Sequence, residues 1–283
     1  MELKDILVHV DASPESDIRV EIAAELARQH DAHLTGLYVV DLVPFMAEVG
    51  TGAIAGRSGM LEAVAALREN ALAAPSRVEE RFSARLDAAG IAGEWRLVES
   101  VVAPTVALHA RYADLVILGQ VNPDAKPPGT AAELVEHVLL AAGRPVLAIP
   151  YIAKPVPLGR NVLVGWNGSR EAARALNDAI PIIAGAQAVT VLAINPRHGI
   201  QGDGDVPAAD IALHLARHGL RAEADHMVTD IPEGAALLDY AADHGCDLIV
   251  IGGYGHSRLR EFALGGVTRT LLQSMTVPIL MSH

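Results

Sequence analysis

The sequence predicts an α/β protein built from two tandem units, each a three-layer α/β/α arrangement around a five-stranded parallel sheet. Short β-branched runs alternate with longer helical patterns, which is typical of parallel strands joined by crossover helices. The strand-like runs are apolar throughout, so each sheet must be covered on both faces. The pattern also occurs twice along the chain, and 283 residues with 51% hydrophobic content are enough for about two domains.

The repeat is visible in matching segments. DILVHVDAS over residues 5–13 matches NVLVGWNGS over residues 161–169, and ADLVILGQ over residues 113–120 matches CDLIVIGG over residues 246–253. The closing segments RPVLAIP and VPILMSH match in the same order. The first half carries additional chain after its second strand, around residues 41–60.

A connector separates the two halves. PYIAKPVPLGR, residues 150–160, contains three prolines, which suit an extended linker. We therefore expect domain 1 to cover residues 1–152 and domain 2 to cover residues 153–283.

The elements of the second half each have a local reason. A helix is expected after Ser169, which is a good N-cap, and Glu171 and Glu233 lie near helix starts, where a negative charge is favoured. Strands are expected near residues 161–166, 188–195, 221–228, 247–252 and 277–282.

Composition excludes several classes of function. A net charge of −12 and an aromatic content of 4% argue against a nucleic-acid partner, because phosphate backbones select basic faces and bases need rings for stacking. We find no leader pattern at the N-terminus and no apolar run of about 18 residues, so we expect a cytoplasmic protein without a membrane span. The single cysteine, Cys246, cannot form an internal disulfide, which agrees with a reducing compartment.

A glycine-rich loop follows the strand near residues 247–252. Open parallel sheets bind ligands at the carboxyl ends of their strands, so the loop GGYGHSRLREFALGG lies where a ligand would bind. Gly252 and Gly255 let a ligand approach the backbone closely, while Gly265 and Gly266 precede a helix whose N-terminus offers free N–H groups.

Charged side chains in the same loop favour a phosphorylated ligand. His256, Arg258 and Arg260 add donors or positive charge to the backbone N–H groups. The alternative interpretation is a flexible loop with a glycine at a tight turn, and composition alone does not separate the two.

The loop GGYGHSRLREFALGGVT resembles the signature loop of the universal stress proteins. Gly252, Gly255 and Gly265 match the three glycines of that signature, and Gly266 stands where the family has Ser or Thr. The matching strand-one endings and closing strands extend the resemblance over nearly the whole chain as a tandem pair. The resemblance implies a sheet order of 3-2-1-4-5, a cytoplasmic location and a role in stress endurance.

In one branch of the family the resemblance implies binding of ATP or AMP, with Mg²⁺ if the ligand is a triphosphate. An Asp that ends strand one would hold the adenosine end, and Asn167 occupies that position in the second half, where it keeps hydrogen bonding but has lost the charge. The nucleotide-binding residues expected in domain 2 are Asn167, Gly252, Gly253, Gly255, His256, Arg258, Gly265, Gly266 and Val267.

The first half has an Asp at the end of its first strand but lacks most of the glycine loop. Asp11 and Gly119 match and define a second candidate ligand site, whereas Asn122, Ala132 and Glu133 replace the later loop positions. A carboxylate repels phosphate, and three prolines in VNPDAKPPGT lack N–H donors. We therefore expect domain 1 to be mainly a structural partner, with an anion site rebuilt from Lys126, Gly129 and Thr130 as the alternative.

Other chemically suggestive residues have simpler interpretations. His214 and His218 have metal-ligand spacing on a helix and His226 follows on the next strand, but two solvent-facing histidines are favoured. The acidic stretch with Asp203, Asp205 and Asp210 does not fit a calcium loop. Ser169 and Ser257 lack a nucleophile elbow. Cys246 and His9 are interpreted as core residues, so no catalytic or metal-binding residue is assigned.

The sequence therefore predicts a stress-response protein that binds an adenine nucleotide or a related phosphorylated ligand without significant catalysis. One alternative is a slow ATP hydrolase or phosphotransfer protein, and another is a module that binds an apolar or lipid-like ligand in the domain 1 cleft. The resemblance also implies that the closing strands of the two domains pair within one chain, and it leaves association into a homodimer open.

Overall fold

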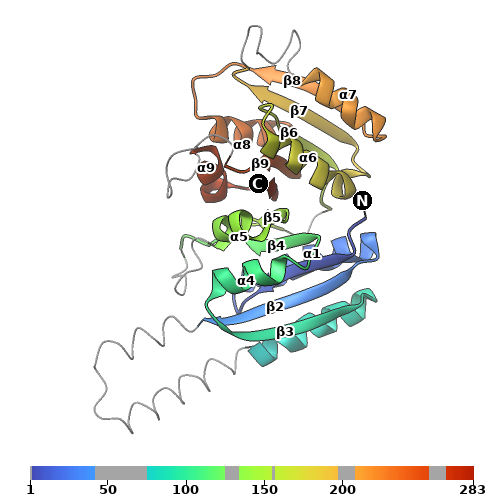
Figure 1. Cartoon of the computed structure of the whole chain (residues 1–283), viewed down its shortest axis with the longest axis vertical. Coiled ribbons are helices and arrows are strands. Elements are labelled where there is room, and N and C mark those ends of the chain that lie inside the picture. Colours follow the sequence, from blue (N-terminus) through green and yellow to red (C-terminus); the bar gives the residue numbers. More distant parts are fainter. Residues whose placement is uncertain (1, 42–74, 125–133, 155–156, 197–207, 255–265) are drawn as a thin grey trace, which may run out of the picture. The chain divides into compact units, whose positions relative to one another are not determined.

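The computed structural model describes residues 2–41, 75–124, 134–154, 157–196, 208–254 and 266–283. The chain forms two compact units, Leu3–Ala142 and Gly143–His283, the second of which also includes the first two residues. Each unit is an α/β structure with helices packed on a sheet (Figure 1). Among the described residues, no helix is long and apolar enough to cross a membrane.

The sheet of the unit Leu3–Ala142 contains four parallel strands. These are β1 (Asp5–Val10), β2 (His33–Asp41), β3 (Gly93–Ser100) and β4 (Leu115–Gly119), in the order β3-β2-β1-β4. The central residues of β1, β2 and β4 are almost completely buried, as a sheet covered on both faces requires, whereas β3 at the edge contains only half-buried and exposed residues. The order agrees with the first four places of the predicted 3-2-1-4-5 arrangement.

Two pairs of helices cover this sheet. Helix α1 (Pro14–His30) and a helix described over residues 75–89 are linked by ion pairs, Arg81 to Asp17 at 3.1 Å and Arg85 to Glu21 at 2.9 Å. The other pair is α4 (Val102–Ala110) and α5 (Leu134–Ala142), which pack against each other. Figure 1 shows α4 on the near side of the sheet and α1 behind it, which gives the predicted three layers.

The sheet of the unit Gly143–His283 reproduces the order in full. The strands β8-β7-β6-β9-β10 lie in that order and are all parallel, so the predicted 3-2-1-4-5 arrangement is confirmed for the second repeat. Their bounds are β6 (Asn161–Gly165), β7 (Ala188–Ile194), β8 (Ala222–Met227), β9 (Leu248–Gly252) and β10 (Ile279–Ser282). The last strand begins two residues later than predicted, because Pro278 has no N–H for the ladder.

A sixth strand in this unit comes from the end of the first repeat. β5 (Val146–Ile149) pairs antiparallel with β10, with Leu147 opposite Leu280 and Ala148 opposite Ile279. All four residues of each strand are buried. RPVLAIP and VPILMSH thus form the strand pair that the resemblance implied, and the sheet is mixed rather than purely parallel.

Four helices complete the unit: α6 (Arg170–Ile183), α7 (Ala209–Arg217), α8 (Glu233–Asp243) and α9 (Gly266–Ser274). The predicted N-cap of α6 is confirmed, since Ser169 Oγ accepts a hydrogen bond from the N–H of Ala172 at 3.1 Å. Helix α6 packs on β9 and β10, while α8 and α9 pack together.

Both repeats fasten the start of their first strand with an aspartate. Asp114 Oδ2 accepts hydrogen bonds from the backbone N–H groups of Lys4 and Asp5, at 2.8 and 3.1 Å. In the second repeat Asp247 accepts hydrogen bonds from the N–H groups of Gly159, Arg160 and Asn161 at 2.8–3.1 Å. In each repeat this aspartate precedes the fourth strand and binds the start of the first strand. It therefore holds β1 beside β4 and β6 beside β9.

We predict that Asp247→Ala lowers the free energy of unfolding by about 1–3 kcal/mol, because three backbone donors lose their acceptor. Asp243→Ala is the matched control, since Asp243 is the exposed last residue of α8 and its replacement should change stability by less than about 0.5 kcal/mol. Urea unfolding measures both. Equal stabilities of the two variants would show that the Asp247 clamp contributes nothing.

Candidate functional site

The candidate site of the second repeat lies at the carboxyl ends of β6 and β9. These two strands are neighbours in the sheet, and the chain leaves them in opposite directions, from β6 toward β7 and from β9 toward β10. Such a switch in direction opens a crevice at the carboxyl edge of a parallel sheet, where ligands usually bind. Asn167 follows β6, and Gly252 ends β9.

Asn167 is held in place but keeps part of its side chain available. Its Oδ1 accepts a hydrogen bond from the N–H of Ser169 at 3.1 Å, and Gly168 between them has φ 69°, which favours glycine. Asn167 is exposed, and its Nδ2 makes no hydrogen bond to another residue in the described ranges. The amide therefore offers an oriented donor beside the N-terminus of α6.

Gly252 is required by the packing of the protein itself. A Cβ at this position would lie 2.5 Å from the backbone carbon of Glu171 and would also overlap the backbone nitrogen of Ala172. The first turn of α6 therefore occupies the space beside this glycine. Close approach of a helix is a structural reason for Gly252 that the sequence did not reveal, alongside the close approach of a ligand.

The chain after Gly252 is anchored to the end of β10. The N–H of Gly253 donates to the carbonyl of Ser282 at 2.8 Å, and His283 Nδ1 lies 3.2 Å from the Gly253 carbonyl, to which it donates. Tyr254 has φ 65°, a left-handed conformation that is uncommon for residues other than glycine. The entry to the glycine loop is thus fixed by backbone contacts.

Only part of the predicted loop lies within the described residues. Gly255, His256, Arg258 and Gly265 lie outside them. The structure places Gly266 at the first position of α9, with open space around its missing Cβ, and Val267 follows within the same helix.

Glu171 and His283 are neighbours of this edge that the sequence did not assign to the site. Glu171 is 5% exposed and is bonded to Arg170 Nε. Burial alone would raise the pKa of the Glu171 carboxyl, but the Arg170 hydrogen bond and the His283 charge lower it below its usual value. The closeness of Glu171 to Gly252 depends on how α6 docks on β9, which no local sequence pattern specifies.

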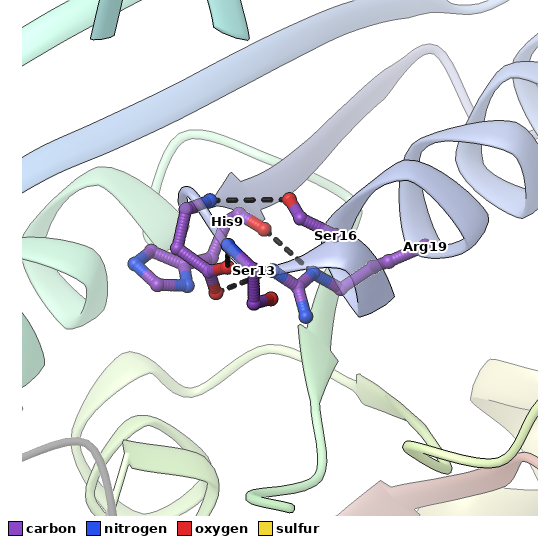
Figure 2. A network of polar contacts seen from close by, with 5 residues as sticks. His9, Ser13, Ser16 and Arg19 are labelled. Carbon is purple, nitrogen blue, oxygen red and sulfur yellow. Dashed lines mark hydrogen bonds and ion pairs between the residues drawn. The ribbon is translucent and has the colours of Figure 1, made fainter. Parts of the chain in front are cut away.

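The matching crevice of the first repeat contains a network of polar side chains (Figure 2). The guanidinium of Arg19 on α1 is buried, and its Nη2 binds Asp11 Oδ2 at 2.7 Å while its Nε donates to the carbonyl of His9 at 2.7 Å. The other oxygen of Asp11 accepts from the N–H of Ser13 at 2.8 Å. Ser16 Oγ accepts from the N–H of Asp11 at 3.1 Å. Asp11 is therefore fully engaged by its own repeat.

The network shifts two ionisation equilibria. Burial would raise the pKa of the Asp11 carboxyl, but the charge of Arg19, the charge of His9 and the Ser13 hydrogen bonds outweigh it and lower the pKa to about 2. Burial and the charge of Arg19 lower the pKa of His9 to about 4, although Asp11 acts in the opposite direction. At pH 7 Asp11 is ionised and His9 is neutral, as expected for a histidine of the core.

The rest of the first crevice is also closed by the chain itself. A Cβ on Gly119 would overlap Arg19 Nη1, so the guanidinium lies directly against the end of β4. Asn122 Nδ2 donates to Glu15 Oε1 at 2.9 Å, which ties the loop after β4 to the first turn of α1. The remaining positions of this loop lie outside the described residues, namely Lys126, Gly129, Thr130, Ala132 and Glu133.

The histidine and cysteine residues considered as metal ligands or reactive groups do not form a metal site within the described residues. His214 and His218 are 4.7 Å apart between ring centroids on α7, but no group of three or more His, Cys, Asp or Glu able to hold a metal occurs in the ranges that the structure covers. His226 is exposed on β8, and Cys246 is buried. Burial and the charge of Asp247 raise the pKa of the Cys246 thiol, which keeps it protonated.

The remaining polar candidates of the sequence have local roles or lie outside the described residues. Ser169 caps α6, and Asp210 lies in the first turn of α7. Asp203, Asp205, Ser257 and Arg260 lie outside the described residues.

Comparison with known proteins agrees with this architecture. A model of the universal stress protein family matches the chain over residues 2–150 and 159–283. Universal stress protein Slr1230 of Synechocystis sp. is 27% identical over 177 residues, which are 59% of this chain and 57% of that protein. The chain thus aligns with less than two thirds of that relative.

Solved structures share the fold over nearly the whole chain. A universal stress protein from Archaeoglobus fulgidus superposes with a TM-score of 0.68 at 16% identity, covering 98% of this chain and 97% of that one. A universal stress protein from Pseudomonas aeruginosa gives a TM-score of 0.56 at 16% identity, covering 99% and 93%. At this identity the likeness shows the tandem fold.

We predict that Gly252→Ala lowers the free energy of unfolding by about 1–3 kcal/mol, because the new methyl group meets backbone atoms of α6 that cannot rotate away. Gly185→Ala is the control, since nothing lies within 4 Å of a Cβ at that position. Thermal and urea unfolding of both variants measure the difference. A Gly252→Ala protein as stable as the control would mean that α6 does not approach β9 as described.

We predict that Asp11→Asn destabilises the protein at pH 7 by about 1–2 kcal/mol, less than for a fully buried pair because the carboxylate is half-exposed. A carboxyl whose pKa falls from 3.8 to about 2 on folding stabilises the folded state above pH 4. The difference between wild type and variant should therefore shrink as the pH falls from 4 toward 2.

Asp17→Asn serves as the control for this pH series, since Asp17 forms an exposed ion pair with Arg81. Its effect at pH 7 should stay below about 1 kcal/mol. Urea unfolding between pH 2 and 7 provides the data. A stability difference for Asp11→Asn that persists unchanged down to pH 2 contradicts the ion pair with Arg19.

Proposed function

The chain belongs to the universal stress protein family, and we propose that it binds ATP, AMP or a related small phosphorylated ligand through its second repeat, without significant catalysis. The proposed contacts are the side chain of Asn167, the backbone of Gly252 and Gly253, the loop residues Gly255, His256, Arg258 and Gly265, and the start of α9 at Gly266 and Val267. Domain boundaries at residues 1–152 and 153–283, internal pairing of the domains and a cytoplasmic location belong to the same proposal.

The observation that carries the proposal is the difference between Asn167 and Asp11. Both accept a hydrogen bond from the serine two residues later, so the two turns have the same local structure. The second oxygen of Asp11 is bound by Arg19, whereas Asn167 Nδ2 bonds to no other residue of the described ranges. A ligand at the second crevice therefore meets an available donor and does not have to displace an internal partner.

Magnesium would enter this site with a triphosphate rather than on a dedicated set of protein ligands. Glu171, whose backbone adjoins Gly252, is buried, and its carboxylate is bonded to Arg170. Asn167 and Gly266 lack the carboxylate and the hydroxyl that could hold the ion or a water molecule. The described residues thus supply binding groups and no dedicated metal site.

The same residues favour binding over turnover. Hydrolysis needs a water molecule activated by a base or a metal, and phosphoryl transfer needs charge stabilisation of the group that moves. The backbone carbon and Cβ of Glu171 lie beside Gly252, and the carboxylate of Glu171 is already bonded to Arg170. A slow ATP hydrolase or phosphotransfer protein remains the alternative that a turnover assay addresses.

An apolar or lipid-like ligand in the first crevice is less well supported. The insert that suggested it, VPFMAEVGTGAIAG over residues 43–56, lies outside the described residues. The described part of this crevice contains the Arg19–Asp11 ion pair, which does not suit an apolar ligand.

We predict that Asn167→Ala weakens ATP and AMP binding about fivefold to tenfold, the loss of about one hydrogen bond, in isothermal titration calorimetry. Asn177→Ala, an exposed asparagine farther along α6, is the matched control and should bind like wild type. Gly266→Ser should fold normally, because nothing lies within 4 Å of its Cβ, and should bind more tightly through the added hydroxyl.

Two outcomes contradict this proposal. Wild type that binds neither ATP nor AMP would remove the proposed ligand class. Release of phosphate from Mg²⁺–ATP at about one per second or faster, lost in Asn167→Ala, would replace the binding function with the enzyme alternative.

A further inference from the structure

Arg19 has no counterpart in the second repeat. The segments DILVHVDAS and NVLVGWNGS place Arg19 opposite Ala175 in the following helices, and Ala175 is completely buried. Arg19 is one of the few charged residues of the described chain that is buried, at 3% exposed. Burying a guanidinium is costly unless it is paired, so the position of its partners shows what it does there.

The partners of Arg19 lie at the carboxyl ends of both strands that frame the first crevice. Its Nε bonds to the carbonyl of His9 in β1, its Nη2 binds Asp11 just after β1, and its Nη1 lies against Gly119 at the end of β4. Figure 2 shows the side chain extending from α1 across the end of β1 toward His9 and Ser13. The guanidinium thus lies at the switch point where a ligand would bind in this fold.

We propose that Arg19 is the internal occupant of the first crevice and that it restricts the chain to one ligand site. The guanidinium uses the oxygen of Asp11 that corresponds to the available amide of Asn167, and it extends from the helix position that Ala175 occupies in the second repeat. The bond between Asn122 and Glu15 closes the crevice from the loop side. This inference rests on the proposed function only in the choice of nucleotide as the probe.

The electrostatics explain why this closure is stable. Arg19 and Asp11 neutralise each other, so no net charge is buried, and the low pKa of Asp11 keeps the pair ionised at pH 7. A ligand that used Asp11 would have to leave the buried guanidinium without its carboxylate, and that cost exceeds the gain of one or two new hydrogen bonds.

The experiment replaces Asp11 and Arg19 of the first repeat with the residue types at the corresponding positions of the second repeat. Asp11→Asn combined with Arg19→Ala reproduces Asn167 and Ala175 and leaves no unpaired charge. AMP is the probe, because its single phosphate demands less of the loop after β4, and equilibrium dialysis counts the AMP bound per chain. We expect the double variant to bind one AMP more than wild type, while Asp11→Asn alone, which keeps Arg19 in place, leaves the count unchanged.

The two hypotheses fail separately in this design. The number of AMP molecules bound per wild-type chain tests the proposed function. The difference in this number between the double variant and wild type tests the role of Arg19. This second test applies whether wild type binds one AMP or none. No additional AMP in a folded double variant overturns the inference, and so does wild type that already binds one AMP per repeat. Circular dichroism confirms that the variants are folded.

A second measurement decides the question if the double variant does not fold. Arg19→Ala alone should lower the thermal unfolding midpoint, and millimolar methylguanidinium should restore part of the loss by entering the vacated crevice beside Asp11. Wild type, whose crevice is filled, should show no such rise. Absence of rescue in Arg19→Ala, or an equal rise in wild type, shows that the guanidinium does not fill a ligand-sized space and overturns the inference.

Discussion

In our account, ligand binding by each repeat depends on what occupies the crevice at the carboxyl ends of its first and fourth strands. In the first repeat the buried guanidinium of Arg19 pairs with the half-exposed carboxylate of Asp11 and joins α1 to the ends of β1 and β4. In the second repeat the first turn of α6 lies so close to β9 that only glycine fits at position 252, and Ala175 stands at the helix position that corresponds to Arg19. The same topology therefore gives one filled crevice and one that keeps an available donor.

The two repeats share their frame and differ in a few side chains. An aspartate at the amino edge fastens the strand starts in both, and an Asp or Asn before a Ser forms the same turn at the carboxyl edge in both. These contacts stabilise the same fold in both repeats, and none of them depends on the helix residue at position 19 or 175. On our proposal, one buried cation added to a repeat takes the place of a ligand, while the sheet and its partner helices keep the same arrangement.

Much of the fold followed from the sequence, because apolar strand runs and alternating helices are local signals. The tandem arrangement and the Ser169 cap were predicted from the residues, whereas the sheet order was implied by the family resemblance. The assigned start of β10 lies two residues later than predicted, next to Pro278, which has no N–H to donate. The candidate site was predicted less completely. The contact of Gly252 with α6 and the burial of Glu171 depend on how a helix docks on a distant strand, which residue patterns do not specify. A signal for Arg19 did exist, since an arginine stands opposite Ala175 when the two repeats are aligned.

Backbone amide NMR of the full chain during an AMP titration tests the central difference between the repeats most directly. The account predicts shifts that saturate at the N–H groups of Ser169, Gly252 and Gly253 beside the second crevice, with no shift at Ser13 or Gly119 beside the first. Saturating shifts at Ser13 and Gly119 in wild type would contradict it, because they would show that a nucleotide enters the crevice that Arg19 occupies.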